Sequence, residues 1–324
     1  MSLISIRLTA QYSSRKVLDE LRLDMLPGEA VGLIGESGSG KSTLALALLR
    51  LLHWKGGTAS GWVLWKGRDL LQLSEREMRR VRGKEIALVL QSAATSLNPA
   101  LKIGTQFHEA WRAHSSEKWA VGRDRARMLL SEVNLPSADE FLSRYPRELS
   151  LGQAQRVLIA LSLLHQPDLV IADEPTSALD VITQREVLEL LSRLRGEHGM
   201  ATLFISHDLL SVGAFCGRVA ILKDGHIVET GETAQIFNNP KHEYTRRLIE
   251  ALPARPTLEV QNDYEQSLGQ LVRLAEAESE REPSLKRVLA FPSGSGVILG
   301  HSEPSCVEAS KPSGVPSQPL QTKR

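Results

Sequence analysis

Residues 35–43 read Gly35-Glu36-Ser37-Gly38-Ser39-Gly40-Lys41-Ser42-Thr43 and match the pattern G-x-x-x-x-G-K-[ST] at every position it fixes. Residues 30–34 before them are a short apolar run, which predicts a buried strand, and residues 44–49 after them are strong helix formers. A glycine-rich loop between a strand and a helix presents a concave set of backbone N–H groups that binds phosphate oxygens. The alternative is a glycine-rich turn with a surface lysine, but strand, loop, Lys-Ser pair and helix are all in register. The loop therefore predicts a nucleoside triphosphate site, in which Lys41 reaches the β- and γ-phosphates and the Ser42 hydroxyl binds Mg²⁺.

Length, charge and cysteine content limit the class of protein. The chain has 324 residues, enough for one large or two smaller domains, and its formal net charge of +1 does not suggest a nucleic-acid partner. No apolar run approaches the roughly 18 residues that span a bilayer. Residues 1–7 alternate like a strand rather than a signal peptide. The two cysteines, Cys216 and Cys306, are too few for a disulfide framework or a four-cysteine metal site. A cytosolic, reduced protein is expected, and any membrane-spanning part must come from another chain.

Three further apolar runs predict buried strands, and each is followed at once by polar side chains. They are residues 85–90 before Gln91, residues 168–172 before Asp173 and Glu174, and residues 201–206 before His207. Ligands of parallel sheets bind at the carboxyl ends of the strands. Adjacent carboxylates there are costly to bury without a role, so Asp173 is predicted to hold Mg²⁺ through water and Glu174 to polarise the attacking water. The alternatives are a solvated strand end for the carboxylates and a structural role for the histidine.

Three other segments predict local structure but are less specific about function. Tyr12 stands in a polar turn, where it either stacks on a purine ring or covers the edge of the sheet, and the local sequence leaves both open. Ser74 is a predicted N-cap for a helix that runs through Arg82, with the basic run 79–82 as a solvated face. Residues 219–229 predict a hairpin around Asp224-Gly225.

The segment that narrows the family lies just before the Asp-Glu strand. Residues 149–153 read Leu149-Ser150-Leu151-Gly152-Gln153 and resemble Leu-Ser-Gly-Gly-Gln, the signature motif of ATP-binding cassette (ABC) ATPases. Further markers of that family occur in order, namely Tyr12 (aromatic loop), Gln91 (Q-loop), Ser177-Ala178-Leu179-Asp180 (D-loop) and His207 (switch histidine). The resemblance covers residues 1 to about 253. Within the family, residues 95–99 and 239–245 are most similar to ATPase subunits of oligopeptide, dipeptide and nickel importers.

The resemblance implies an α/β fold with a RecA-like P-loop NTPase core, an antiparallel β subdomain and a helical insertion at about 92–160. It places an ABC ATPase domain at 1–253 and a largely irregular or disordered C-terminal extension at 254–324. The proline- and serine-rich residues 302–324 agree with that expectation.

The resemblance also assigns roles to individual residues. Catalysis is expected from Glu174 as general base, with His207, Gln91 and Lys41. The residues expected to bind ATP in this chain's own site are Tyr12, Gly35, Glu36, Ser37, Gly38, Ser39, Gly40, Lys41, Ser42, Thr43 and Asp173. Mg²⁺ is expected at Ser42, Gln91 and Asp173. Four residues are expected to complete a partner's ATP site across a head-to-tail dimer: Ser150, Gly152, Gln153 and Asp180.

The implied assembly is a membrane importer for peptides or a related small solute. Its expected partners are integral-membrane permease subunits, a second ABC ATPase subunit (a heterodimer preferred over a homodimer) and, indirectly, an extracytoplasmic solute-binding protein. No nucleic-acid partner is expected, and the chain is expected to lie on the cytoplasmic side of the inner membrane.

Two departures from the family pattern affect these expectations. Leu151 replaces the first glycine of the signature pair, which would weaken the partner's site rather than this chain's own. Only Cys306 lies in the extension, where the family commonly carries a cysteine cluster, so no iron–sulfur cluster is expected. The alternatives are a soluble, non-transport ABC ATPase and a regulatory subunit with a degenerate trans site. A GTPase is disfavoured because the chain lacks Asn-Lys-x-Asp.

Overall fold

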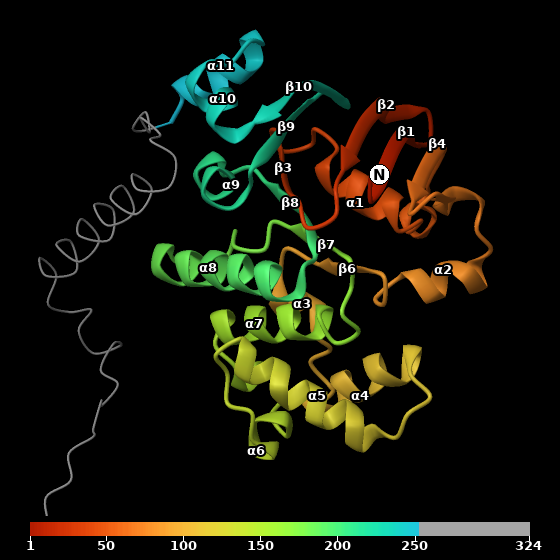
Figure 1. Ribbon diagram of the computed structural model, residues 1–324, viewed down its shortest axis with the longest axis vertical. Helices are drawn as coiled ribbons and strands as arrows, with labels where there is room; N and C mark the ends of the chain where they lie inside the picture. The colour runs from red at the N-terminus through yellow and green to blue at the C-terminus, as the bar shows by residue number, and fades with distance from the viewer. Residues whose placement is uncertain (253–324) are drawn as a thin grey trace, which may run out of the picture. The chain divides into compact units, whose positions relative to one another are not determined.

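The computed structural model describes residues 1–252, which contain two β-sheets with helices packed against them (Figure 1). The smaller sheet is antiparallel, with the strand order β2-β1-β4-β5. Its strands are β1 (Ile4–Tyr12), β2 (Arg15–Met25), β4 (Gly57–Trp65) and β5 (Arg68–Asp69). Burial alternates along β1, as expected for a sheet with one face on the core.

The larger sheet has the strand order β10-β9-β3-β8-β7-β6 and is parallel from β9 to β6. Its strands are β3 (Ala30–Ile34), β6 (Ile86–Val89), β7 (Leu169–Asp173), β8 (Ala201–Ser206), β9 (Arg218–Lys223) and β10 (His226–Glu232). β10 pairs antiparallel with β9 through the turn at Asp224-Gly225, which confirms the predicted hairpin.

Residues on the parallel strands alternate between two hydrophobic cores. On β8, Phe204 belongs to one core, whereas Leu203 and Ile205 belong to the other. The first core includes buried residues of α7, α8, α9 and the segment between β6 and β7, and the second includes those of α1 and the antiparallel sheet. The strands are therefore covered on both faces, which explains why their sequences are continuous apolar runs.

The helices of the described residues have the following bounds. They are α1 (Lys41–Leu48), α2 (Glu75–Val81), α3 (Ala93–Ser96), α4 (Ile103–His114), α5 (Trp119–Glu132), α6 (Asp139–Leu142), α7 (Leu151–Ser162), α8 (Val181–His198), α9 (Leu209–Phe215), α10 (Thr233–Asn238) and α11 (Glu243–Glu250). Short 3₁₀ turns cover Leu52–Lys55, Leu70–Gln72 and Pro146–Glu148. Within this part of the chain, no helix combines the length and the apolar character that a membrane span requires.

The chain between β6 and β7 is helical, as the predicted insertion requires, and α4, α5 and α6 lie beyond α7 on the side away from β1 and β2 (Figure 1). Trp111 of α4 is only 8% exposed. It stacks on His165 with ring centroids 5.5 Å apart. A Cβ at Gly122 of α5 would lie 2.5 Å from the Trp111 ring, so only glycine allows α4 and α5 to approach this closely. The predicted extension at 254–324 and Cys306 lie outside the described residues.

Helix α2 shows one success and one error of the sequence interpretation. Ser74 is the N-cap, as predicted, and it also forms a capping box with Glu77. The solvated face holds for Arg79 and Arg80 but is wrong for Arg82. The Arg82 guanidinium donates to the Leu49 carbonyl at 2.7 Å and pairs with Glu75, which ties α2 to the end of α1.

Candidate nucleotide-binding site

The glycine-rich loop joins β3 to α1, and its shape depends on glycine at two positions. Gly40 caps α1 with a φ of +112°, a conformation that side chains strongly disfavour. A Cβ at Gly35 would lie 2.4 Å from the Leu222 carbonyl oxygen, because the loop passes directly over β9. Lys41 and Ser42 consequently begin α1, whose N-terminus is positive through the aligned peptide dipoles. The loop therefore has the geometry of an anion-binding site.

Lys41 is held over this loop. Its side chain is almost buried, and its ammonium donates to the carbonyl oxygens of Gly35 at 2.7 Å and Glu36 at 3.0 Å. Burial lowers the pKa of Lys41 below its usual range, while the nearby carboxylates of Glu174 and Asp173 act in the opposite direction. A phosphate bound at the loop would give the Lys41 ammonium a negatively charged acceptor in place of these two neutral carbonyl oxygens.

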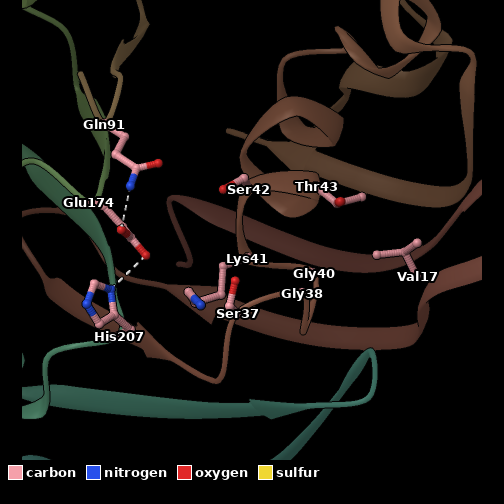
Figure 2. Close-up of a pocket in the computed structure, with 10 residues that line it drawn as sticks. All are labelled: Val17, Ser37, Gly38, Gly40, Lys41, Ser42, Thr43, Gln91, Glu174 and His207. Atoms are coloured by element: carbon pink, nitrogen blue, oxygen red, sulfur yellow. Dashed lines mark hydrogen bonds and ion pairs between the residues drawn. The ribbon is translucent and has the colours of Figure 1, made fainter. Parts of the chain in front are cut away.

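Glu174, Gln91 and His207 form a hydrogen-bonded group across the sheet. The Glu174 carboxylate accepts from Gln91 Nε2 at 2.9 Å and lies 2.9 Å from His207 Nδ1 (Figure 2). These residues follow β7, β6 and β8, whose carboxyl ends lie at one edge because the strands are parallel and in register. Glu174 has a φ of +48°, and its N–H donates to the Ile205 carbonyl at 2.8 Å. Non-glycine residues adopt this backbone conformation uncommonly, and strained positions of this kind cluster at active sites as well as in turns.

Asp173 lies beside this group at the end of β7. Burial raises the pKa of Asp173, and a hydrogen bond from Ser42 opposes that shift. Its Oδ1 is buried and has no hydrogen-bond partner among the described residues. An orphaned carboxylate oxygen is costly unless a ligand satisfies it, so the atom fits a cation or a cation-bound water.

The loop and the strand ends enclose one cavity of about 500 Å³. Its lining residues are Val17, Ser37, Gly38, Gly40, Lys41, Ser42, Thr43, Gln91, Glu174 and His207 (Figure 2). Gly35, Glu36, Ser39 and Asp173 belong to the same loop and strand end but do not line the cavity. The Ser39 hydroxyl, like Asp173 Oδ1, is buried without a partner.

Tyr12 was predicted to contact the nucleotide but does not line the cavity, whereas Val17 lines the cavity and was not predicted. Tyr12 is not in the lining; its ring lies over Gly57, where a Cβ would be 2.7 Å away, and packs against the second core. Its adenine-stacking role stays a prediction. Val17 does line the cavity, and nothing in the sequence marks it, because an apolar residue on β2 has the same pattern as any sheet residue.

The signature segment lies in a second cavity of about 450 Å³ that shares no lining residue with the first. The second cavity includes Ser150, Leu151, Gly152, Gln153 and Asp180. Ser150 caps α7 through a reciprocal pair with Gln153: the Gln153 N–H donates to Ser150 Oγ at 3.2 Å, and the Ser150 N–H donates to Gln153 Oε1 at 3.1 Å. The structure therefore does not bring these residues to the chain's own nucleotide cavity, and their role on another subunit stays a prediction.

Leu151 fits this position without strain. It is the first residue of α7, its φ is not positive, and its side chain is 40% exposed. The glycine of the family pattern is therefore not required by the backbone here, and the leucine projects from the surface of the second cavity.

Comparisons with known proteins agree with this geometry. The profile of the family described as ABC transporter matches residues 18–177, and a profile described as the C-terminal region of oligopeptide/dipeptide transporters matches residues 228–273. A peptidoglycan transport ATP-binding protein of Agrobacterium fabrum is 46% identical over 73% of this chain, but the match spans only 43% of that relative's length. A putative peptide import ATP-binding protein of Brucella abortus is 44% identical, with 73% of this chain and 71% of the relative covered. The dipeptide transport ATP-binding protein DppD of Escherichia coli is 38% identical, with coverages of 77% and 76%.

Solved structures give the same result. The dimeric post-hydrolysis state of the ATP-binding cassette MJ0796 bound to ADP and Pi is 28% identical, with a TM-score of 0.61, and the match covers 71% of this chain and 98% of that one. The α/β core, the antiparallel subdomain and the helical insertion are thus confirmed as a nucleotide-binding cassette. The chain belongs to the ABC transporter family of ATP-binding and ATP-hydrolysing subunits.

Proposed function

We propose that this chain is the ATP-hydrolysing subunit of a membrane importer for peptides or a chemically related small solute. The proposal is supported by the names of the Brucella and Escherichia relatives and by the match of residues 228–273 to the oligopeptide/dipeptide transporter profile. The observation that carries the catalytic part is the Glu174 carboxylate, which Gln91 and His207 hold at the mouth of the phosphate loop.

Each residue of the cavity has a role in this proposal. Lys41 and the N–H groups of the loop bind the β- and γ-phosphates of ATP. Glu174 accepts a proton from the attacking water, and Gln91 and His207 orient the carboxylate and the water. Val17, which lines the cavity, would contact the nucleoside, and adenine stacking is assigned to Tyr12 from the family resemblance alone, because its ring does not line the cavity. Since the carboxylate is held from both sides before any ligand arrives, little reorganisation is needed when ATP binds.

The donor set also fits Mg²⁺. Ser42 and Gln91 line the cavity, Asp173 supplies the unpartnered buried oxygen beside them, and hydroxyl, amide and carboxylate oxygens are the ligands this cation takes. When bound with ATP, the cation would neutralise phosphate charge during transfer of the γ-phosphoryl group. Ser42 and Gln91 would contact it directly and Asp173 through water.

Asp173→Asn is expected to raise the Mg²⁺ concentration needed for half-maximal nucleotide binding by about 10- to 100-fold, the range for loss of an outer-shell ligand partner. The measurement is a Mg²⁺ titration of the fluorescence of a bound ATP analogue. Asp168→Asn is the matched control, because Asp168 precedes the same strand at its opposite end and pairs with Lys66. An unchanged Mg²⁺ requirement in Asp173→Asn would remove that residue from the proposed cation site.

We further propose that the second cavity binds the ATP of a partner ATPase, with Ser150, Gly152, Gln153 and Asp180 toward that nucleotide. The positive N-terminus of α7 at Ser150 suits a γ-phosphate. A different ATPase chain is preferred as the partner, since Leu151 leaves this chain with an altered signature. Permease subunits would hold the pair at the cytoplasmic face of the inner membrane, and a solute-binding protein would deliver the peptide from the other side.

If Leu151 restricts the partner's site, Leu151→Ala and Leu151→Gly are both expected to raise the ATP turnover of the assembled transporter severalfold. Alanine removes the bulk and keeps helix propensity, whereas glycine in a helix costs up to about 1 kcal/mol, so agreement between the two isolates the effect of side-chain size. Met128→Ala, at an exposed residue of α5, serves as the control. Turnover that is unchanged in both Leu151 variants would show that the leucine is tolerated.

The proposed function is tested with the full-length chain isolated from detergent-solubilised membranes of its own host. We expect it to co-purify with integral-membrane subunits and a second ATPase, and the reconstituted complex to take up labelled oligopeptides into vesicles in an ATP-dependent manner. Uptake of a different solute only would overturn the peptide assignment and leave the ATPase assignment intact. Recovery of the chain from the soluble fraction, with no membrane subunit attached, would favour the soluble, non-transport alternative.

A further inference from the structure

The segment that follows α10 is anchored to β10, the antiparallel edge strand of the larger sheet, by hydrogen bonds from its main-chain N–H groups to a carboxylate. The Glu229 carboxylate on β10 accepts the N–H groups of Lys241 at 2.8 Å and His242 at 3.0 Å. His242 is the N-cap of α11, and its Nδ1 accepts the Tyr244 N–H at 3.1 Å. Pro240 cannot continue α10, so the chain turns here and α11 starts at a defined place. The first turn of α11 is thereby fixed against β10.

This anchoring directs Tyr244 toward the phosphate loop. Tyr244 is only 7% exposed, and its hydroxyl oxygen accepts the backbone N–H of Glu36 at 3.3 Å, although the two residues are 208 positions apart. The ammonium of Lys223 lies 4.8 Å from the centre of the Tyr244 ring. Burial raises the pKa of Tyr244; the hydrogen bond from the Glu36 N–H opposes that shift, and interactions with the Glu36 carboxylate add to it. The hydroxyl is therefore neutral and available for hydrogen bonding at physiological pH.

Glu36 connects this contact to the nucleotide-binding groups. Its carbonyl oxygen accepts the Ser39 N–H at 3.2 Å and the Lys41 ammonium at 3.0 Å. One peptide segment is thus fixed on both sides: the Glu36 N–H is held from outside the loop by Tyr244, and its carbonyl organises the interior of the loop. Tyr244 does not line the nucleotide cavity, so its effect on ATP must pass through Glu36.

We propose that Tyr244 is a positioning residue of the nucleotide site, which holds the phosphate loop in its binding conformation through the main chain of Glu36. Without the hydroxyl, the loop would sample more conformations before ATP binds, and binding would have to restrict them. Glu174, Gln91 and His207 lie on other strands and keep their contacts, so the chemical step would be largely unaffected. The inference rests on the nucleotide site proposed above.

The test compares full-length wild type with Tyr244→Phe, which keeps the ring, its packing and the contact with Lys223 and removes only the hydroxyl. We expect the Kd for the fluorescent nucleotide mant-ATP to rise about three- to tenfold, the range for loss of one hydrogen bond. We expect the KM for ATP to rise in parallel and kcat to stay within about twofold of wild type, the pattern of lost ground-state binding.

Phe237→Leu is the control for a merely structural role, because Phe237 is a buried aromatic residue of the neighbouring helix α10 whose ring lies beside Gly213 of α9. It is expected to lower Tm and leave the Kd for mant-ATP unchanged. The inference is overturned if Tyr244→Phe binds mant-ATP as tightly as wild type. It is also overturned if the Kd rises equally in Phe237→Leu at matched loss of Tm. If wild type itself does not bind mant-ATP, the nucleotide site fails, and the inference with it.

Discussion

Glu174→Gln is expected to reduce the ATP turnover of this protein by at least about a hundredfold while ATP binding persists, because a general base contributes roughly 10²–10⁴-fold to such reactions. Glutamine has nearly the same shape as glutamate, so it can still occupy the space between Gln91 and His207. Its amide cannot accept a proton from water. The variant therefore separates the chemical step from the geometry of the cavity.

The measurement is steady-state phosphate release together with mant-ATP binding, for wild type and for Glu174→Gln. Glu140→Gln, at an exposed residue of α6, is the matched control for loss of a carboxylate. Turnover near the wild-type rate in Glu174→Gln would transfer the base role to another group. Gel filtration of Glu174→Gln in ATP adds information on assembly: a stable homodimer of this chain alone would count against the preferred heterodimer.

Lys41→Ala is expected to weaken ATP binding by about 10- to 150-fold, which corresponds to the roughly 1.5–3 kcal/mol of one hydrogen bond to a charged group. The Lys41 ammonium is the cation nearest the loop, and it is already placed on the carbonyls of Gly35 and Glu36. Since burial lowers its pKa, the charged form is partly destabilised in the fold, and removing it should cost little folding stability. Lys41→Ala is therefore expected to weaken ATP binding strongly and to change the free energy of unfolding little.

The corresponding experiment measures the Kd for mant-ATP and the Tm of Lys41→Ala. Lys118→Ala, at an exposed residue before α5, controls for the loss of a positive charge. We expect the Tm to remain near that of wild type while the affinity falls. An affinity equal to wild type would mean that Lys41 does not contact the phosphates. A large loss of Tm would instead show that its two carbonyl contacts support the fold.

The sequence predicted the parts of this site that depend on local chemistry. The glycine-rich loop, the strand before it and the helix after it follow from residues 30–49, and the polar side chains after β6, β7 and β8 follow from the edge rule of parallel sheets. The capping box at Ser74 and the hairpin at Asp224-Gly225 also depend on neighbours in the chain. Such features are encoded within a few residues, so they can be derived without the fold.

Contacts between distant segments were not predictable in this way. Arg82 belongs to a basic run, but its side chain is bound to the Leu49 carbonyl just after α1, which no local pattern reveals. β4 begins at Gly57, which pairs with Tyr12 and whose missing side chain leaves room for that ring, and nothing in the local sequence marks this start. Tyr244 could be recognised as part of a subgroup motif, but its bond to Glu36 depends on a separation of 208 residues.

Because successive residues of β7 and β8 face different cores, these strands tolerate substitutions better than insertions or deletions. Deleting one residue inside β8 would exchange the faces of Phe204 and its neighbours, so that each core would receive side chains shaped for the other. The same deletion would rotate or withdraw His207 from Glu174, since the strand's last residues set its position. In these strands, the same alternation of residues sets both the packing of the two cores and the position of the catalytic side chains. Insertions and deletions inside these strands are thus disfavoured, whereas the loops tolerate them even at the catalytic edge, as the helical segment between β6 and β7 shows.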